Sequence, residues 1–159
     1  MEKEIVKDGL IKEYYESGEL QTESNYVNGK LSGTYKKYYE NGKLKEEYNY
    51  IDGNLDGLCK GYYESGELEF EYNYILGNIN GICKEYYENG NLKIEKIYSK
   101  DKLNGGVIEY FEDGKIKLES SYTNGKLNKS FGKKIAPTVI KLIIKLVIIG
   151  IVVYFFKNR

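Results

Sequence analysis

Residues 36–47 read Lys-Lys-Tyr-Tyr-Glu-Asn-Gly-Lys-Leu-Lys-Glu-Glu, and close variants of this string return every 24 residues. An Asn-Gly pair between runs rich in tyrosine and leucine is the strongest short signal for a β-hairpin, because both residues accept the positive φ of a two-residue turn. The same slot carries Ser-Gly, Asn-Gly or Asp-Gly in the other copies, at 17–18, 65–66, 89–90 and 113–114. The string therefore predicts a hairpin, and its repetition predicts a row of hairpins.

The repeated segment divides into five units, each of which starts at a glycine. The units are 9–32, 33–56, 57–80, 81–104 and 105–128. A second turn, around Gly29, Gly53, Gly77 and Gly125, joins one unit to the next; Asp101 replaces this glycine in the fourth unit, where we expect a different turn. Such a period is typical of an array in which each unit packs only on its neighbours. We expect a mainly β protein, an elongated single antiparallel sheet of tandem β-hairpins followed by one C-terminal α-helix.

The register of the hairpin follows from the position of its turn. Counting outward from a two-residue turn at 41–42 places Tyr39 opposite Leu44 and Lys36 opposite Glu47. The same count gives Lys12–Glu23, Lys60–Glu71 and Lys84–Glu95, whereas the fifth unit has Ile108 against Glu119, and Phe70 faces Gly61. Opposite charges on facing positions contribute roughly 0.2–1 kcal/mol per pair. The recurring pairs therefore support this register.

The two tyrosines of each Tyr-Tyr pair are predicted to lie on opposite faces, because side chains alternate along a strand. The predicted buried face carries Tyr15, Tyr39, Tyr63, Tyr87 and Phe111, with Leu20, Leu44, Leu68, Leu92 and Ile116 and with Tyr26, Tyr50, Tyr74, Tyr98 and Tyr122. The other face carries an exposed ladder of candidate partner-binding residues, Tyr14, Tyr38, Tyr62, Tyr86 and Tyr110. These rings form a recognition surface, lie across the Lys and Glu side chains and stiffen the sheet, or do both.

The chain resembles the MORN (membrane occupation and recognition nexus) repeat, in the variant form of bacterial proteins and of the YwqK antitoxin family. The resemblance rests on the strings at 36–47 and 62–68 and on the Asn-Gly-Lys-Leu closures at 28–31 and 124–127. It covers residues 9–128 and implies an elongated sheet of hairpins that serves as a contact module for proteins or lipid surfaces. In YwqK-like relatives it implies an immunity role.

Composition argues against several classes of function. Basic and acidic residues both number 24, so a nucleic-acid partner has no support, and there is no histidine for an imidazole metal site or a His-based triad. The glutamates recur in every unit, as a structural ladder requires. We expect no catalytic residue, no metal, no cofactor and no small-molecule substrate. Cys59 and Cys83 occupy one slot in adjacent units, too far apart for a disulfide, and are predicted to be buried thiols in the column of Ile11, Tyr35 and Val107.

The remaining segments are a lead-in strand at 1–8, a basic linker at 129–134 and an apolar helix at 135–156. Three placements of the helix stay open: spanning a membrane, which we favour, lying at the interface, or capping the open end of the sheet. The predicted membrane-interface residues are Lys133, Lys134, Lys141, Lys145, Lys157 and Arg159. No apolar stretch follows the N-terminal Met-Glu-Lys-Glu, so we expect no signal peptide. The basic residues before the apolar run then predict repeats on the cytoplasmic side of the cell membrane.

Together these features predict a non-enzymatic, membrane-anchored repeat scaffold that binds a partner protein. The resemblance makes a toxin the most concrete partner and an antitoxin or immunity role the most concrete function, with membrane lipid contacted by the C-terminal helix. The alternative is a membrane-active protein whose C-terminal helices assemble in the bilayer.

Overall fold

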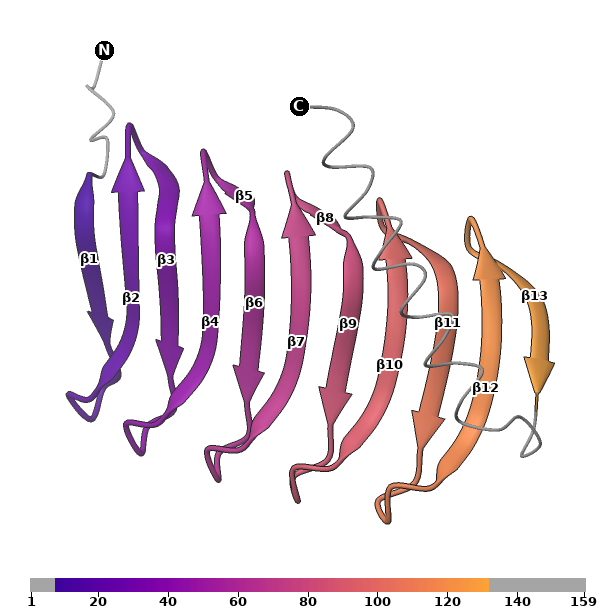
Figure 1. The fold of residues 1–159 in the computed structure, drawn as a ribbon. Helices are drawn as coiled ribbons and strands as arrows, with labels where there is room; N and C mark the ends of the chain where they lie inside the picture. Colours follow the sequence, from indigo (N-terminus) through magenta and orange to yellow (C-terminus); the bar gives the residue numbers. More distant parts are fainter. Residues whose placement is uncertain (1–7, 132–159) are drawn as a thin grey trace.

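A computed structural model describes residues 8–131, which form one antiparallel sheet of 13 strands; all of them except β5 and β8 follow one another across the sheet in chain order (Figure 1). The strands are β1 (Gly9–Tyr14), β2 (Leu20–Val27), β3 (Lys30–Tyr38), β4 (Leu44–Ile51), β5 (Asn54–Leu55), β6 (Gly57–Tyr62), β7 (Leu68–Ile75), β8 (Asn78–Ile79), β9 (Gly81–Tyr86), β10 (Leu92–Ser99), β11 (Lys102–Tyr110), β12 (Ile116–Thr123) and β13 (Lys126–Phe131). The short strands β5 and β8 pair with β4 and β7. The predicted sheet of tandem hairpins is confirmed.

The predicted C-terminal helix at 135–156 lies outside the described residues, as does most of the lead-in. Strand β13 continues to Phe131 and thus enters the stretch predicted as a linker. Within residues 8–131 every regular element is a strand. The chain therefore presents an open, single-layered sheet over the part that the structure describes.

The hairpin within each unit closes through a three-residue loop, and the predicted two-residue turn is wrong. The Gly42 N–H donates to the Tyr39 carbonyl at 2.9 Å, and the Tyr39 N–H donates to the Lys43 carbonyl at 2.8 Å. Gly42 has a φ of 80°, whereas Asn41 does not have a positive φ. This is a type I turn followed by a left-handed glycine. The Asn41 side chain accepts the Lys43 N–H at 2.9 Å, so the Asn-Gly pair stabilises a different turn from the one expected.

A β-bulge next to the loop restores the predicted register farther along the hairpin. Tyr38 pairs with Leu44, but Lys36 still pairs with Glu47. The longer loop shifts the pairing by one residue and the bulge shifts it back. The same shift occurs in all five hairpins. The Lys–Glu pairs are therefore confirmed, whereas the predicted Tyr39–Leu44 pair is wrong.

The turns that join one unit to the next are two-residue turns. Asp52 and Gly53 have φ values of 49° and 82°, and the flanking residues Ile51 and Asn54 pair directly. The fourth unit keeps the same geometry, with φ values of 48° at Lys100 and 64° at Asp101. The expectation of a different turn there is wrong, because aspartate tolerates the left-handed conformation.

The predicted buried face is also wrong, because within residues 8–131 the sheet has one layer. Tyr39, Leu44 and Tyr50, which represent the three predicted columns, are only half-buried. Conversely, only Tyr14 of the predicted exposed ladder is exposed, at 58%; its four counterparts are half-buried. Cys59 and Cys83 are buried free thiols, each 1% exposed, as predicted.

Candidate functional site

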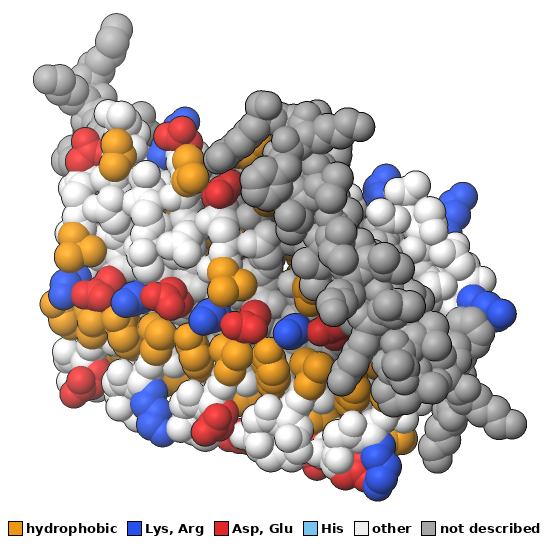
Figure 2. Space-filling view, in the orientation of Figure 1, with side chains coloured by type: hydrophobic (Ala, Val, Ile, Leu, Met, Phe, Trp, Pro, Cys, Tyr) orange, Lys and Arg blue, Asp and Glu red, His pale blue; other side chains and the backbone are white. Residues whose placement is uncertain are grey.

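One face of the sheet, called here the charged face, carries the Lys–Glu pairs as a row across neighbouring units. Figure 2 shows this row of alternating basic and acidic side chains beside a band of hydrophobic ones. The Nζ to Oε distances are 2.7 Å in Lys12–Glu23, 3.6 Å in Lys36–Glu47, 3.7 Å in Lys60–Glu71 and 3.8 Å in Lys84–Glu95. In the fifth unit Ile108 pairs with Glu119, as predicted. Partly exposed pairs of this kind contribute about 1 kcal/mol or less each, so the row aligns the strands more than it stabilises them.

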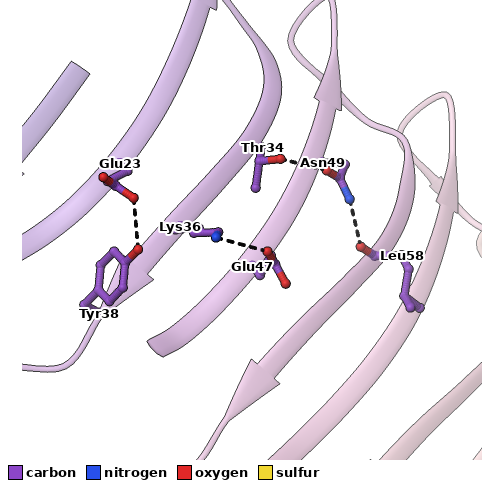
Figure 3. Close-up of polar contacts among 7 residues, drawn as sticks. All are labelled: Glu23, Thr34, Lys36, Tyr38, Glu47, Asn49 and Leu58. Atoms are coloured by element: carbon purple, nitrogen blue, oxygen red, sulfur yellow. Dashed lines mark hydrogen bonds and ion pairs between the residues drawn. The ribbon is translucent and has the colours of Figure 1, made fainter. Parts of the chain in front are cut away.

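The ladder tyrosines lie on the charged face, and two of them, Tyr38 and Tyr86, bond to glutamates of the preceding unit. The Tyr38 hydroxyl donates to Glu23 at 3.0 Å (Figure 3), and the Tyr86 hydroxyl donates to Glu71 at 3.1 Å. Burial and the Glu71 carboxylate raise the pKa of Tyr86 to about 12. Hydrogen bonds from Lys12 and then Tyr38 lower the pKa of Glu23, and burial opposes them. These contacts fit a stiffening role for the ladder, and its role in recognition stays a prediction.

A second polar link on the charged face, made by an asparagine side chain, joins the second unit to the third. In Figure 3 the Asn49 side chain lies between Thr34 and Leu58, and it donates to the Leu58 carbonyl at 3.3 Å. It does so next to Gly57, where a φ of 97° interrupts the strand pairing. Asn25 and Asn73 donate instead to carbonyls two positions earlier in the repeat, those of Ser32 and Asn80, which end their own units. Ile97 occupies this position in the fourth unit and cannot donate such a bond.

The second tyrosine of each Tyr-Tyr pair forms what we call the tyrosine latch, a hydrogen bond to the backbone of the next unit. The four latches are Tyr15 to the Tyr38 carbonyl at 2.7 Å, Tyr39 to Tyr62 at 2.6 Å, Tyr63 to Tyr86 at 2.7 Å and Tyr87 to Tyr110 at 2.8 Å. The fifth unit has Phe111 in this position, and Phe111 is exposed. The latch hydroxyl is therefore present in the first four units, each of which is followed by another described unit whose backbone carbonyl accepts the bond.

The opposite face of the central units is lined by rings and is called here the aromatic face. It comprises Tyr35, Tyr48, Tyr50, Phe70, Tyr72 and Tyr74. The Tyr35 ring stacks on Tyr48 at 6.0 Å between centroids and meets Tyr50 edge-on at 6.3 Å. Burial, more than any nearby charge, raises the pKa of Tyr48. All six rings are half-buried, so each still presents surface that a partner could cover.

Phe70 shapes the middle of the aromatic face. A Cβ on the facing Gly61 would lie 2.1 Å from Phe70 Cε1, so the ring lies directly over the glycine, as predicted. Its centroid lies 4.9 Å from that of Tyr72. Two shallow hollows flank it. One, of about 110 Å³, is lined by Tyr63, Glu69, Phe70, Tyr72, Glu85, Tyr86 and Lys93, and the other, of about 170 Å³, by Tyr48, Leu55, Cys59, Phe70, Tyr72 and Tyr74.

A charged cluster borders the first hollow. Glu85 accepts hydrogen bonds from Lys96 Nζ and from the Tyr72 hydroxyl, both at 2.8 Å. Burial opposes ionisation of Glu85, but these bonds outweigh it and lower its pKa. Burial likewise opposes the charge of Lys96, yet the bond to Glu85 raises the pKa of the ammonium. The cluster gives the aromatic face one fixed pair of opposite charges.

Sequence reasoning missed the aromatic face, because it assigned part of this face to a core. One sequence feature could have indicated this face: in several units a tyrosine pairs with the glycine that starts the unit, as in Gly33–Tyr50 and Gly57–Tyr74. The predicted membrane-interface residues, from Lys133 to Arg159, lie outside the residues that the structure describes.

Residues 8–131 contain few side chains arranged for catalysis or metal binding. Residues 8–131 contain no group of three or more His, Cys, Asp or Glu side chains that could hold a metal ion. Burial raises the pKa of both cysteine thiols, which disfavours the reactive thiolate. In the same residues no helix has the length and apolar character needed to cross a membrane.

The MORN repeat variant family matches the chain at residues 7–28, 31–52, 55–75, 79–100 and 103–124. The matched segments start at the 24-residue interval seen in the sequence and each contains one hairpin loop with its flanking strands. No curated protein matches the chain. Five matches in register, covering more than half of the sequence, show that the chain belongs to the MORN repeat variant family.

Proposed function

We propose that this protein is a non-enzymatic repeat scaffold that binds a partner protein through the aromatic face. The observation that carries the proposal is a row of half-buried rings on a sheet with no second layer within residues 8–131. Aromatic side chains dominate the energetics of protein interfaces, because they bury a large area and lose little conformational entropy. Repeats of this family are typically non-catalytic, which agrees with a binding role.

A protein is the class of partner that this surface suits best. The aromatic face extends over several strands and its hollows are shallow, of about 110 and 170 Å³. Small-molecule sites are usually enclosed and measure roughly 300–1,000 Å³. The Glu85–Lys96 pair places a negative and a positive charge side by side. Such a pair can orient a protein partner, but it does not favour a polyanion such as a nucleic acid.

The most concrete form of this function is toxin neutralisation, as the YwqK resemblance suggests, at the cytoplasmic face of a bacterial membrane. Membrane attachment by residues 135–156 is part of the proposal and rests on their apolar, basic-flanked sequence. The scaffold would then hold its partner at the membrane surface. Assembly of the C-terminal helices in the bilayer remains the alternative prediction.

Binding to the product of the adjacent gene, measured by calorimetry, tests the proposal. The double change Tyr50→Ser and Tyr74→Ser removes two rings from the aromatic face and should weaken binding at least tenfold. The matched change Tyr38→Ser and Tyr62→Ser removes two rings from the charged face and should alter the affinity less than threefold. Circular dichroism establishes that both variants fold. Equal losses from the two variants, or a larger loss from the charged face, would refute the assignment of the aromatic face.

A further inference from the structure

The charged face changes character in the last two units. Ile108 occupies the position that holds a lysine in the other four units: Lys12, Lys36, Lys60 and Lys84. Ile97 occupies the position that holds an asparagine in the first three: Asn25, Asn49 and Asn73. Ile97 pairs with Ile82 on the adjacent strand β9. The face that is polar in the first units thus becomes an apolar patch, defined here as Ile82, Ile97, Ile108 and Glu119.

Glu119 keeps its carboxylate although the lysine opposite it is gone. Ile97, Ile108 and Glu119 are 3%, 4% and 4% exposed, whereas the equivalent residues of the second unit, Asn49, Lys36 and Glu47, are half-buried. Neither carboxylate oxygen of Glu119 has a hydrogen-bond partner among the described residues, and burial raises its pKa. A buried carboxylate is costly unless a cation or donors satisfy it.

We propose that residues 135–156 of this chain pack on the apolar patch and bring a lysine to Glu119. The backbone of Phe131, the last described residue, pairs with that of Glu119, so the chain continues from the edge of the patch. As a helix, residues 135–156 would extend about 33 Å, whereas the four strand spacings from β13 to β9, which carries Ile82, amount to about 19 Å. The segment therefore reaches the patch.

Charge complementarity selects this segment as the occupant. Residues 132–159 contain only basic charged residues, namely Lys133, Lys134, Lys141, Lys145, Lys157 and Arg159. Lys141 and Lys145 lie among isoleucine, leucine and valine, which matches a patch of isoleucines around one unpaired carboxylate. A sheet-bound segment and a membrane-inserted segment use the same apolar side chains. The patch and the bilayer therefore compete for residues 135–156, and release from the sheet precedes insertion.

Hydrogen exchange of residues 135–156 in the full-length protein, without detergent or lipid, tests the proposal. Ile108→Lys restores the lysine of the other units, pairs Glu119 internally and removes an apolar contact. We expect the 135–156 amides to exchange at least tenfold faster in this variant. Leu58→Lys, which makes the same kind of change on the charged face of the third unit, is the matched control and should leave the exchange unchanged.

A second readout is the fraction of protein bound to vesicles of phosphatidylglycerol and phosphatidylcholine, which should rise severalfold for Ile108→Lys. Ile97→Asn, which installs the residue that three other units carry, provides an independent test should Ile108→Lys fail to fold. Rapid exchange in the unaltered protein, equal exchange in the patch variants and the control, or insolubility of the full chain without detergent would each overturn docking. None of these results affects the aromatic face, whose partner binding is measured separately.

Discussion

The tyrosine latch allows a prediction whose size can be worked out from the structure. Tyr63→Phe removes only the hydroxyl that donates to the Tyr86 carbonyl at 2.7 Å. A typical intramolecular hydrogen bond contributes about 0.5–1.5 kcal/mol net, so the free energy of unfolding should fall by about 1 kcal/mol. Four simultaneous Tyr→Phe changes should cost about 4 kcal/mol, a large share of the roughly 5–15 kcal/mol that stabilises a typical domain.

The assay is urea denaturation followed by circular dichroism. With an m-value of about 1–3 kcal/mol/M, a loss of 1 kcal/mol lowers the midpoint by roughly 0.3–1 M. Phe111→Tyr is the control: it adds a hydroxyl where residues 8–131 offer no following hairpin, and it should change stability by less than about 0.5 kcal/mol. If Tyr63→Phe shifts the midpoint no more than Phe111→Tyr, the latch does not couple the units.

Three further predictions concern the array, a turn and the charged cluster. Deleting residues 57–80 should leave a shorter folded sheet with a cooperative melt, whereas deleting 57–68 should break the register; equal damage would reject the 24-residue unit. Leu76 is 71% exposed with a φ of 50°, so Leu76→Asn should raise the urea midpoint by an amount equivalent to about 0.5 kcal/mol; a lower midpoint would show that leucine packs there. The lowered pKa of Glu85 means that its contribution to stability is present above its unfolded-state pKa and is lost as pH falls through the folded-state pKa. Without Lys96, burial should instead raise that pKa, so Lys96→Met should reduce the acid-induced loss of stability measured from pH 6 to 3, and an unchanged pH profile would show that the ion pair does not set it.

Most of the fold could be predicted from the 24-residue period of the sequence. The Lys36–Glu47 pairing was predictable because opposite charges recur at one position of each hairpin, and the buried thiols were predictable from their shared column. The hairpin loop could not be predicted, because an Asn-Gly pair is compatible with both a two-residue turn and a type I turn followed by a left-handed glycine. The three-residue loop shifts the strand pairing by one residue, and the adjacent bulge shifts it back. The predicted register of the Lys–Glu pairs is correct only because the loop and the bulge occur together.

The candidate site was harder to predict. The alternation of side chains along a strand assigns them to the two faces of the sheet, but it does not tell which face packs against other residues. Tyr50 was assigned to a core that a single layer of strands does not form within residues 8–131, and Tyr38 was assigned to an open ladder although its hydroxyl bonds to Glu23. Contacts between units decide both cases. Such contacts join residues 15 to 23 positions apart, as in Tyr38–Glu23 and the latches, which a pattern read within one hairpin does not capture.

Hydroxyl-radical footprinting of the complex with the adjacent gene product shows which face of the sheet binds the partner, because it reports side chains on the two faces separately. We expect Tyr48, Phe70 and Tyr72 to lose most of their labelling when the partner binds, while Tyr38 and Tyr62 keep theirs. Protection of the charged-face tyrosines with continued labelling of the aromatic face would contradict it, and failure of the two proteins to bind would contradict the toxin-neutralising role.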